Sequence, residues 1–406
     1  MDKNITCIRG GKIILENEVL VGKVLIFNDK IIDILDEENF AKKSPTHEMK
    51  IIDANGKYVS PGFIDIHIHG SGGKDTMDGE IADLNIISET IAESGVTGFL
   101  PTTMTMEKEK IYKALDSVKL AMQENVKGAK ILGAHMEGPF ISPKYQGAQN
   151  KDYIRKPDLK FIKDYIDIIK IITMAPEEDF QFKFIKSVKN NSDIVLAMGH
   201  TNANYETALE AVRVGISNAS HIFNAMRPFH HRDPGVVGAV LKSNISFELI
   251  ADTLHIHPAV FQMLLNAKGK DKMILITDSM RAGSMSGGNW ELGGQQVVVD
   301  HNSARLTDGT LAGSILTLNK AVLNILKYTD LEIYEAVALA SLNPAKLIHM
   351  DNSKGSIKLG KDADVIIFDE ELNVDLSIAG GKVIYSINHP WSEAATTDEN
   401  LLVLSS

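Results

Sequence analysis

Two histidines separated by a single residue, His67 and His69, carry the clearest chemical signal in the chain. They lie in the segment PGFIDIHIHG, which covers residues 61–70. Side chains two positions apart in an extended strand face the same side, so both imidazoles can reach one ion. The apolar run before them predicts a buried strand, and the glycines after them predict a turn. The pair therefore predicts metal ligands at the mouth of a barrel, with two ordinary half-buried histidines as the alternative.

Further imidazole and carboxyl groups stand at or just after the ends of later apolar runs. These are His135, Glu137, His200, His221, His255, His257 and Asp278. Each alone could be a packing or capping residue, but the strand ends of a parallel barrel converge on one mouth. Imidazole and carboxylate together suit a divalent cation such as zinc or ferrous iron, with cobalt and manganese as further candidates. Taken jointly, these positions predict a metal centre.

Asp278 closes the last of these runs, in the sequence Ile-Thr-Asp-Ser. A carboxylate beside a metal-activated water can accept its proton and later deliver a proton to a leaving group. Bound metal lowers the pKa of water from about 15.7 towards 7, which makes a nucleophile available at neutral pH. The combination indicates hydrolysis at a carbon centre, while a helix cap is the plain structural alternative for Asp278.

A basic loop follows His221. Its sequence, HIFNAMRPFHHR over residues 221–232, brings together Arg227, His230, His231 and Arg232. Clustered cationic groups on an acidic protein suit an anionic substrate group such as phosphate, which arginine grips with two donors. A solvated basic loop is an equally good interpretation of the sequence alone.

The elements that must position these residues follow a repeating pattern, in which short apolar runs alternate with amphipathic helical stretches. Strands are expected at residues 62–66, 96–101, 131–136, 168–174, 194–198, 216–220, 246–251 and 273–277. Eight strand–helix repeats are typical of an α/β fold of the (β/α)₈ TIM-barrel type. No helix is evident between residue 220 and Pro234.

Short strand-like segments at both chain ends have a different texture, with Gly-Gly and Asn-Asp turns between them. They are expected at residues 5–8, 12–15, 21–27 and 30–35, and again at 355–357, 363–369, 374–378 and 382–386. Neither end alone has enough strands for a stable core. We therefore expect residues 1–58 and 353–406 to form one small β-sandwich domain, and residues 59–352 to form the barrel.

Composition narrows the class of partner. The net charge of −11 argues against nucleic acid or an anionic membrane surface. The single cysteine, Cys7, cannot form an intramolecular disulfide, and the N-terminus has no continuous apolar core of a signal peptide. No stretch approaches the roughly 20 apolar residues of a membrane span. These features together predict a cytoplasmic protein.

Several motifs taken together resemble the N-acetylglucosamine-6-phosphate deacetylase family, a branch of the metal-dependent amidohydrolase superfamily. They are PGFIDIHIHG, AHMEGPFISPKYQGAQ, MGHT, SHIFNAM, ADTLH, ITDSM and GTLAGS, in the family's order between residues 61 and 314. The resemblance implies that Glu137, His200 and His221 hold the principal metal. It further implies that His67 and His69 hold a second ion, so that one or two cations bind each subunit, and that Asp278 is the general base and acid.

The resemblance also implies substrate contacts and an assembly. The implied substrate-binding residues are Ala148, Gln149, Asn224, Ala225, Arg232, Asp252, Thr253, Leu254, His255, Leu311, Ala312 and Gly313. Gln149 departs from the histidine of some relatives, which leaves its contact to the acetamido group open. In the family the basic loop lies near a subunit interface, which implies a homodimer.

The implied reaction is hydrolysis of N-acetyl-D-glucosamine 6-phosphate to D-glucosamine 6-phosphate and acetate, in amino-sugar catabolism or cell-wall recycling. The sequence leaves open whether other N-acetylated sugar phosphates are accepted. Two other classes compete with this hypothesis. A cyclic amidase or amino-acid deacetylase of the same superfamily would commonly have lysine in place of Glu137. A metal-free scaffold homologue would have lost ligands that this chain retains.

Overall fold

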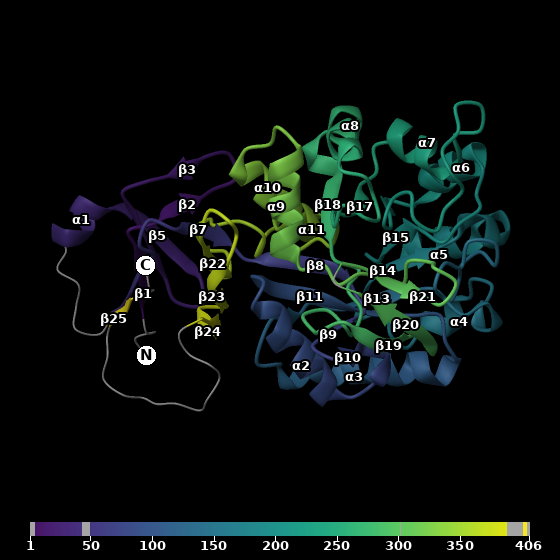
Figure 1. Cartoon of the computed structure of the whole chain (residues 1–406), viewed down its shortest axis with the longest axis horizontal. Coiled ribbons are helices and arrows are strands. Elements are labelled where there is room, and N and C mark those ends of the chain that lie inside the picture. The colour runs from purple at the N-terminus through teal and green to yellow at the C-terminus, as the bar shows by residue number, and fades with distance from the viewer. Residues whose placement is uncertain (1–4, 43–48, 301, 388–400, 404–406) are drawn as a thin grey trace.

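The computed structural model describes residues 5–42, 49–300, 302–387 and 401–403, which form a barrel and a smaller sandwich (Figure 1). Eight parallel strands make the barrel: β8 (Phe63–Ile68), β11 (Val96–Thr103), β13 (Ala134–Glu137), β14 (Ile169–Met174), β15 (Val195–Met198), β16 (Asn218–Ala219), β17 (Phe247–Ile250) and β18 (Met273–Ile276). They coincide with the eight expected runs. The predicted (β/α)₈ fold with a small sandwich domain is confirmed.

Backbone hydrogen bonds join neighbouring strands around the whole barrel. Strands β8, β11, β13, β14, β15 and β16 pair in parallel, as do β17 and β18. The Ala219 amide donates to the Ser246 carbonyl at 3.1 Å and joins β16 to β17. The Asp278 amide donates to the His67 carbonyl at 2.9 Å and closes the ring between β18 and β8. The ends of β8 and β18 are therefore neighbours, although 200 residues of sequence separate them.

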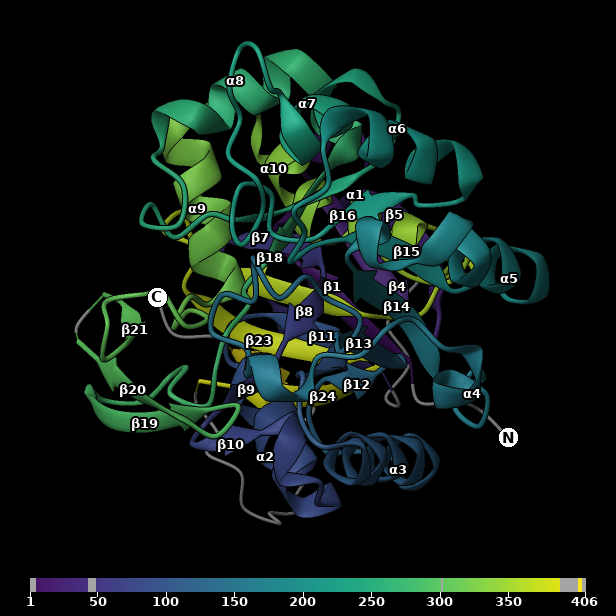
Figure 2. The same cartoon turned by 90° about the vertical axis from the view of Figure 1, so that its right-hand side faces the viewer.

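Helices surround the strands, as the view in Figure 2 shows. They are α2 (Ile81–Ala92), α3 (Lys108–Glu124), α4 (Leu159–Ile162), α5 (Lys183–Asn191), α6 (Tyr205–Val214), α7 (Gly235–Lys242), α8 (Ala259–Lys268), α9 (Leu318–Tyr328), α10 (Ile333–Ala340) and α11 (Leu342–Leu347). In α3, Ile111, Leu115 and Val118 recur at helical spacing and are buried against the barrel. As expected, no helix forms between residue 220 and Pro234, and α7 begins directly afterwards, although Gly235 and Gly238 weaken the helical signal of its sequence.

The sandwich consists of two sheets. One has the order β25 (Leu401–Val403), β6 (Lys50–Asp53), β1 (Thr6–Arg9), β4 (Lys23–Phe27) and β5 (Ile31–Asp36). The other has the order β24 (Lys382–Ser386), β23 (Val374–Ala379), β22 (Val365–Phe368), β7 (Tyr58–Pro61), β2 (Lys12–Ile14) and β3 (Val19–Leu20). Apolar residues of both sheets, such as Leu25 and Ile367, share one buried core. No strand forms at 355–357, where one was expected.

Strand β7 joins the two parts of the molecule. It pairs with β2 in parallel and with β22 antiparallel, so strands from both chain ends meet on it. The expected domain boundary at residue 59 falls inside this strand. Phe63, at the start of β8, lies 6.4 Å from Phe368 of β22 between ring centroids. The sandwich thus packs at the N-terminal ends of β8 and β11, and the C-terminal ends of the barrel strands lie away from it (Figure 1).

A three-stranded sheet that the sequence analysis did not anticipate lies between β18 and α9. We call it the mouth sheet; it comprises β19 (Gly288–Leu292), β20 (Gln295–Val299) and β21 (Ala304–Leu306). The Gln295 side-chain amide donates to the Ala148 carbonyl, which ties this sheet to the loop after β13. Smaller elements are α1 (Glu37–Lys42), β9 (Gly70–Ser71), β10 (Lys74–Asp75), β12 (Lys130–Ile131) and several short 3₁₀ turns.

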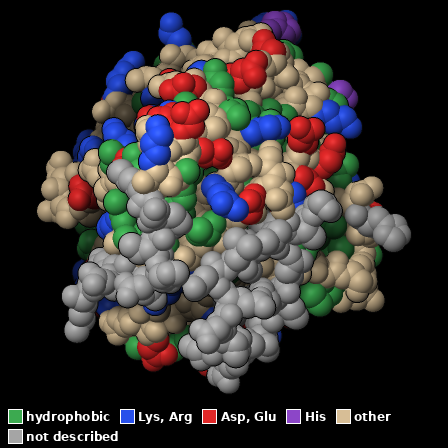
Figure 3. Space-filling model, turned by 90° about the vertical axis from the view of Figure 1, so that its left-hand side faces the viewer, with side chains coloured by type: hydrophobic (Ala, Val, Ile, Leu, Met, Phe, Trp, Pro, Cys, Tyr) green, Lys and Arg blue, Asp and Glu red, His purple; other side chains and the backbone are tan. Residues whose placement is uncertain are grey.

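The sandwich end of the molecule shows basic and acidic side chains interspersed over its described residues (Figure 3). Among the described residues of this face, charges of both signs are mixed, which is unlike the single-sign field that attracts a polyanion. In the part of the chain that the structure describes, every helix is too short or too polar to cross a lipid bilayer.

Candidate active site

One oxygen of Glu137 lies at the centre of a histidine cluster at the C-terminal end of the barrel. Glu137 Oε1 is 2.9 Å from His221 Nε2, 3.1 Å from His200 Nε2 and 3.2 Å from His67 Nε2. The two Nε2 atoms of His200 and His221 are 3.2 Å apart. All four side chains are almost completely buried. Ends of strands β8, β13, β15 and β16 thus bring their ligand-type atoms to one point.

His67, His69 and Asp278 form a second group that borders the first. Asp278 Oδ1 lies 3.2 Å from His69 Nε2 and 3.8 Å from His67 Nε2. His69 Nε2 is also 3.4 Å from Glu137 Oε2, so that carboxylate borders both groups. As the alternation along an extended strand predicts, both histidines of β8 face the same side.

The outer nitrogens of three histidines are held by acceptors. His69 Nδ1 faces the Thr102 carbonyl at 3.2 Å, and His200 Nδ1 faces the Tyr145 carbonyl at 3.1 Å. His67 Nδ1 lies 2.8 Å from Glu248 Oε2. An acceptor at Nδ1 keeps one proton there, so a ring that gives up its other proton turns the lone pair of Nε2 towards the cluster. Imidazoles in this state are ready to bind a cation.

The carboxylates around these rings favour positive charge. Burial disfavours a charged His67, yet Glu137 and Glu248 outweigh it and hold the pKa of that imidazole well above its usual value. Burial is likewise outweighed at His69, where hydrogen bonds to Asp278 and Glu137 raise the pKa to about 10. Burial alone would raise the pKa of Asp278, but His69 and His67 lower it to about 2. The pocket therefore attracts cations, whether protons or metal.

Three of the residues in the cluster have a strained backbone. His200, His221 and Asp278 have φ values of 48°, 25° and 49°. Residues other than glycine rarely adopt positive φ, at a cost of about 1–3 kcal/mol each, and such strain gathers at functional sites. In each case the residue follows the end of a barrel strand, where a sharp turn aims its side chain into the mouth.

These residues fit a divalent cation. Ligand atoms of a tetrahedral zinc site lie about 2.0–2.2 Å from the ion and therefore about 3.4 Å from one another. The distances of 2.9–3.2 Å among Glu137 Oε1, His200 Nε2 and His221 Nε2 are close to that spacing. His67, His69 and Asp278 also offer ligand atoms within 4.8 Å of one another. Buried, converging donors with outer nitrogens already engaged are the arrangement that a metal centre requires.

A cavity of about 390 Å³ opens above the cluster. Its lining includes His69, Glu137, His200, His221 and Asp278 of the predicted metal and catalytic set. His67 lies beneath them and is fully buried. This volume lies within the range of about 300–1,000 Å³ that is usual for small-molecule sites.

The structure brings some of the implied substrate-binding residues to this cavity and not others. Those that line it are Ala148, Gln149, Asn224, Ala225, His255, Leu311 and Gly313. Asp252, Thr253, Leu254 and Ala312 do not line it. Asp252 instead holds His255, because its Oδ2 lies 2.6 Å from His255 Nδ1. Ala312 is fully buried, and Leu254 faces solvent.

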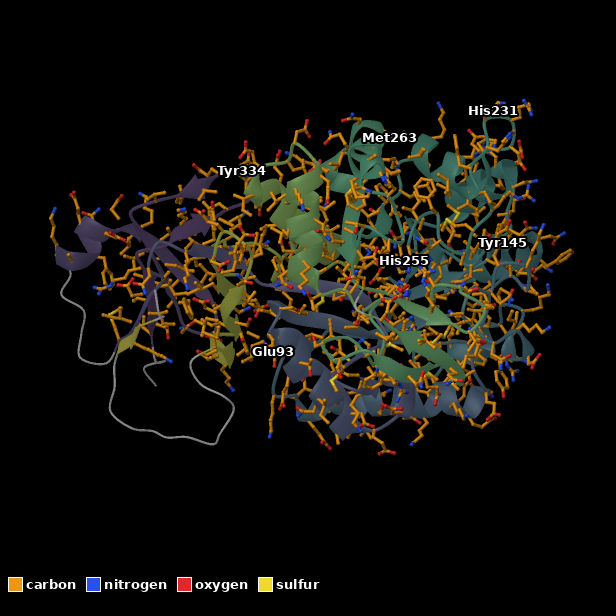
Figure 4. The ribbon with its side chains drawn as sticks, viewed as in Figure 1. Glu93, Tyr145, His231, His255, Met263 and Tyr334 are labelled. Atoms are coloured by element: carbon orange, nitrogen blue, oxygen red, sulfur yellow. The ribbon has the colours of Figure 1, made fainter. Side chains whose placement is uncertain are left out.

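Arg232 does not reach the cavity of its own chain. It lies in an exposed loop, where its guanidinium contacts the neighbouring His231 at 2.8 Å. Figure 4 shows His231 at the outer edge of the barrel domain, far from His255. The structure therefore separates this arginine from the reaction centre of the same chain.

Three residues make contacts that the sequence did not predict, although Gln149 itself was among the implied substrate-binding residues. Arg305, in β21 of the mouth sheet, is the one Lys or Arg side chain among the described residues that line the cavity. Gln149 Nε2 donates to Glu137 Oε2 at 2.6 Å, and Gln149 Oε1 accepts from the Thr105 amide at 2.7 Å, so this residue holds the metal-type carboxylate. The third is Glu248, whose sequence signal is a single carboxylate inside an apolar strand.

His135 is not turned towards the cavity. Its Nδ1 faces the Ile66 carbonyl at 2.8 Å, and its Nε2 lies 2.7 Å from Thr173 Oγ1. Burial is the first of the causes that hold the pKa of this imidazole well below its usual value. His135 is thus a neutral supporting residue beneath His67. The two rings meet edge-on, with 4.4 Å between their centroids.

The strand ends of this (β/α)₈ barrel bring buried histidines and carboxylates together at one cavity. This combination of fold and site is typical of a metal-dependent amidohydrolase. The model of the amidohydrolase family matches residues 58–387. The chain is 41% identical over 381 residues to the N-acetylglucosamine-6-phosphate deacetylase of Bacillus subtilis (strain 168), covering 92% of this chain and 95% of that protein. The chain therefore belongs to the N-acetylglucosamine-6-phosphate deacetylase branch of the amidohydrolase family.

Solved structures agree with this assignment. The crystal structure of N-acetylglucosamine-6-phosphate deacetylase from Pasteurella multocida matches with a TM-score of 0.88 and 31% identity, over 93% of this chain and 99% of that one. A substituted form of the enzyme from Mycobacterium smegmatis, in complex with N-acetyl-D-glucosamine-6-phosphate, matches with a TM-score of 0.85 and 25% identity, over 94% and 99%. The family membership that the motifs predicted is confirmed.

Proposed function

We propose that this protein hydrolyses N-acetyl-D-glucosamine 6-phosphate to D-glucosamine 6-phosphate and acetate. The observation that carries the proposal is the position of Asp278. Its carboxylate borders the metal-type cluster and lines the same cavity, with Oδ1 3.2 Å from His69 Nε2. A carboxylate so placed can move a proton between a water molecule and a departing amine. Membership of the deacetylase branch supports the choice of substrate.

Glu137, His200 and His221 would hold the principal cation, and His67 with His69 would hold a second one. When bound, the metal polarises the amide carbonyl and lowers the pKa of water, which supplies a nucleophile at neutral pH. Zinc and iron suit these ligands best, and cobalt and manganese are alternatives.

The other steps belong to this chain's own side chains. Asp278 accepts the proton of the attacking water, and the same carboxyl group then protonates the amine as the C–N bond breaks and acetate leaves. Gln149 keeps Glu137 in place through its short hydrogen bond. His255, fixed by Asp252, orients the sugar at the cavity wall. Asn224, Ala225 and Leu311–Gly313 shape the pocket around the amide.

Two arginines are candidates for the phosphate. Arg305 is already at the cavity, and its guanidinium is held by the Ser303 hydroxyl at 3.2 Å and the Gly309 carbonyl at 2.9 Å. Arg232 lies on an exposed loop that ends far from the cavity of its own chain, next to the exposed Phe229. In a homodimer, this loop would reach the cavity of the second subunit. We propose such a dimer, working in the cytoplasm.

The test is acetate release by the purified protein with its metal content measured. Acetate release is measured from N-acetylglucosamine 6-phosphate, N-acetylgalactosamine 6-phosphate and an N-acetylated amino acid, and ring opening is measured for dihydroorotate, which has no acetyl group to release. Turnover of the first, alone or with the second, supports the proposal. If only the amino acid or only the cyclic amide is hydrolysed, the protein has another amidohydrolase activity. Bound metal without any acetate release would refute the proposal, and absence of metal would favour the scaffold alternative.

A further inference from the structure

Glu248 is an acidic residue with no assigned part in the proposed reaction. It occupies the second position of β17, in the sequence Phe-Glu-Leu-Ile, and none of its surface is exposed. A buried charge costs several kcal/mol unless it is paired and hydrogen-bonded, and an apolar residue would serve the strand better. Its presence in the barrel therefore calls for a partner that needs the charge.

The partner is His67. Glu248 Oε2 lies 2.8 Å from His67 Nδ1, and Glu248 Oε1 accepts from Asn218 Nδ2 at 2.8 Å. This pair of contacts fixes the carboxylate between β16 and β8. It also fixes the imidazole, whose opposite nitrogen points to Glu137 Oε1 at 3.2 Å. A series of hydrogen bonds from Asn218 through Glu248 to His67 thus links the barrel interior to the metal-type cluster.

No other histidine of the cluster has a carboxylate behind it among the described residues. His69 and His200 face backbone carbonyls, and Nδ1 of His221 is buried without a hydrogen-bond partner in the described part of the chain. A carboxylate behind a metal-ligating imidazole fixes its orientation and increases its basicity more than a carbonyl does. His67 is also the ligand with no exposed surface at all, so its orientation is set wholly from within the barrel.

We propose that Glu248 is a positioning residue that sets the occupancy of the second cation site, formed by His67, His69 and Asp278, through its hydrogen bond to His67. The inference rests on the metal assignment of the proposed function. Glu248 does not contact His200 or His221, so the principal site keeps its own ligands when Glu248 is changed. The carboxylate also supplies the additional negative charge that two divalent cations in one pocket require.

The test is Glu248→Gln in the full chain. Glutamine has the same size, and its side-chain oxygen can keep the hydrogen bond from Asn218 Nδ2, which leaves an uncharged NH₂ group facing His67 Nδ1 in place of the carboxylate oxygen. After dialysis against zinc buffers of fixed free concentration, zinc per chain is measured by elemental analysis. We expect the weaker zinc to bind about 10- to 100-fold less tightly. The tighter zinc should bind as in the unchanged protein.

A second variant and a matched control keep the test decisive. Glu248→Asp keeps the charge but withdraws the oxygen from His67, and should also lose the weaker zinc selectively. Asp179→Asn changes another buried carboxylate, which accepts from the Phe184 and Ile185 backbone amides at 3.0 and 2.9 Å and does not line the cavity, and should leave both zinc affinities unchanged. Cobalt absorption spectra of each protein report the same two sites independently of activity.

Three results would overturn the inference. They are equal zinc affinities in the unchanged protein and Glu248→Gln, an equal loss in Asp179→Asn, or only one zinc in the unchanged protein at saturating concentration. Each is distinct from failure of the proposed function. The protein could bind two zinc ions in the expected way and yet release no acetate from N-acetylglucosamine 6-phosphate. That result would support Glu248 as a positioning residue and refute only the proposed substrate.

Discussion

His200 and His221 present their Nε2 atoms to each other at 3.2 Å, across the same oxygen of Glu137. Two ring nitrogens at this distance can share only one proton, and the outer nitrogen of His200 is already engaged by the Tyr145 carbonyl. The contact is favourable when a cation lies between them. Strained backbones at both residues hold the arrangement in place. Metal binding should therefore determine both activity and stability.

Removal of the metal with a chelator should abolish acetate release and lower the melting temperature. Ligand binding to the folded state at 100 times Kd stabilises a protein by about 2.7 kcal/mol, which is lost with the ion. Differential scanning calorimetry with and without chelator measures the shift, and added zinc or ferrous iron should restore both properties. An unchanged melting temperature in fully metal-free protein would contradict this prediction.

Metal affinity should increase with pH. In metal-free protein, carboxylate neighbours outweigh the burial of His69 and raise its pKa to about 10, and they hold the pKa of His67 well above its usual value. Both imidazoles then carry protons at pH 7, and a cation must displace them. For each proton that the metal displaces, Kd should fall about tenfold for every unit by which the pH rises, as long as the pH stays below the pKa of that imidazole in the folded protein. Calorimetry in buffers of different ionisation enthalpy counts the released protons, and no release at pH 7 would contradict the raised pKa values.

Asp278→Asn should lower kcat by about 10²- to 10⁴-fold with little change in KM. The amide keeps the size of the side chain but cannot accept the proton of water or return it to the amine. Steady-state kinetics on N-acetylglucosamine 6-phosphate measures the loss. Zinc content should be measured in parallel, because a variant that has also lost metal would not isolate the proton-transfer role.

Arg305→Ala should raise KM for the phosphorylated sugar. A hydrogen bond to a charged group contributes about 1.5–3 kcal/mol, which corresponds to about 10- to 100-fold in kcat/KM. Unphosphorylated N-acetylglucosamine is the matched control, since its turnover should be unaffected. Arg232→Ala provides the comparison for the exposed loop, and sedimentation of the same samples shows whether its effect follows dimer formation. Equal losses on both sugars would exclude a phosphate role for Arg305.

Phe368→Ala should destabilise the fold without changing the metal content of the folded protein. Phe368 is fully buried and packs on Tyr58 at 5.7 Å and on Phe63 at 6.4 Å between ring centroids. Truncation of such a residue costs about 3–5 kcal/mol, because a cavity remains at the junction of sandwich and barrel. Urea unfolding followed by fluorescence measures the change. Zinc content equal to that of the unchanged protein serves as the control.

The sequence was sufficient to predict the barrel strands and the metal-type residues. Each strand is a short apolar run, and His200, His221 and Asp278 come directly after such runs, where parallel strands place their ends together. These signals are local, and the convergence follows from the topology. The family resemblance assigned Glu137 to the principal metal and added Ala148, Gln149, Asn224, Ala225, Leu311 and Gly313 of the cavity lining.

Other features depend on contacts that no local pattern reveals. Glu248 pairs with His67 across 181 residues, and its charge within β17 carried no indication of a partner. Arg305 reaches the cavity only because the mouth sheet folds over the loop after β13, whereas Arg232 is carried away by a loop whose course its composition does not determine. Helix α7 forms despite two glycines, because tertiary packing outweighs propensity.

The placement of β7 has a consequence for biosynthesis. This strand needs β2 on one side and β22 on the other, and β22 belongs to the last tenth or so of the chain. On the ribosome the seven sandwich strands that precede the barrel, β1 to β7, must wait for β22 to β25 while the entire barrel is made. The sandwich is therefore the first domain to be synthesised in part and the last to be completed. Truncation near residue 365 should leave exposed strand edges at the N-terminus and promote aggregation, even though the reaction centre itself is complete.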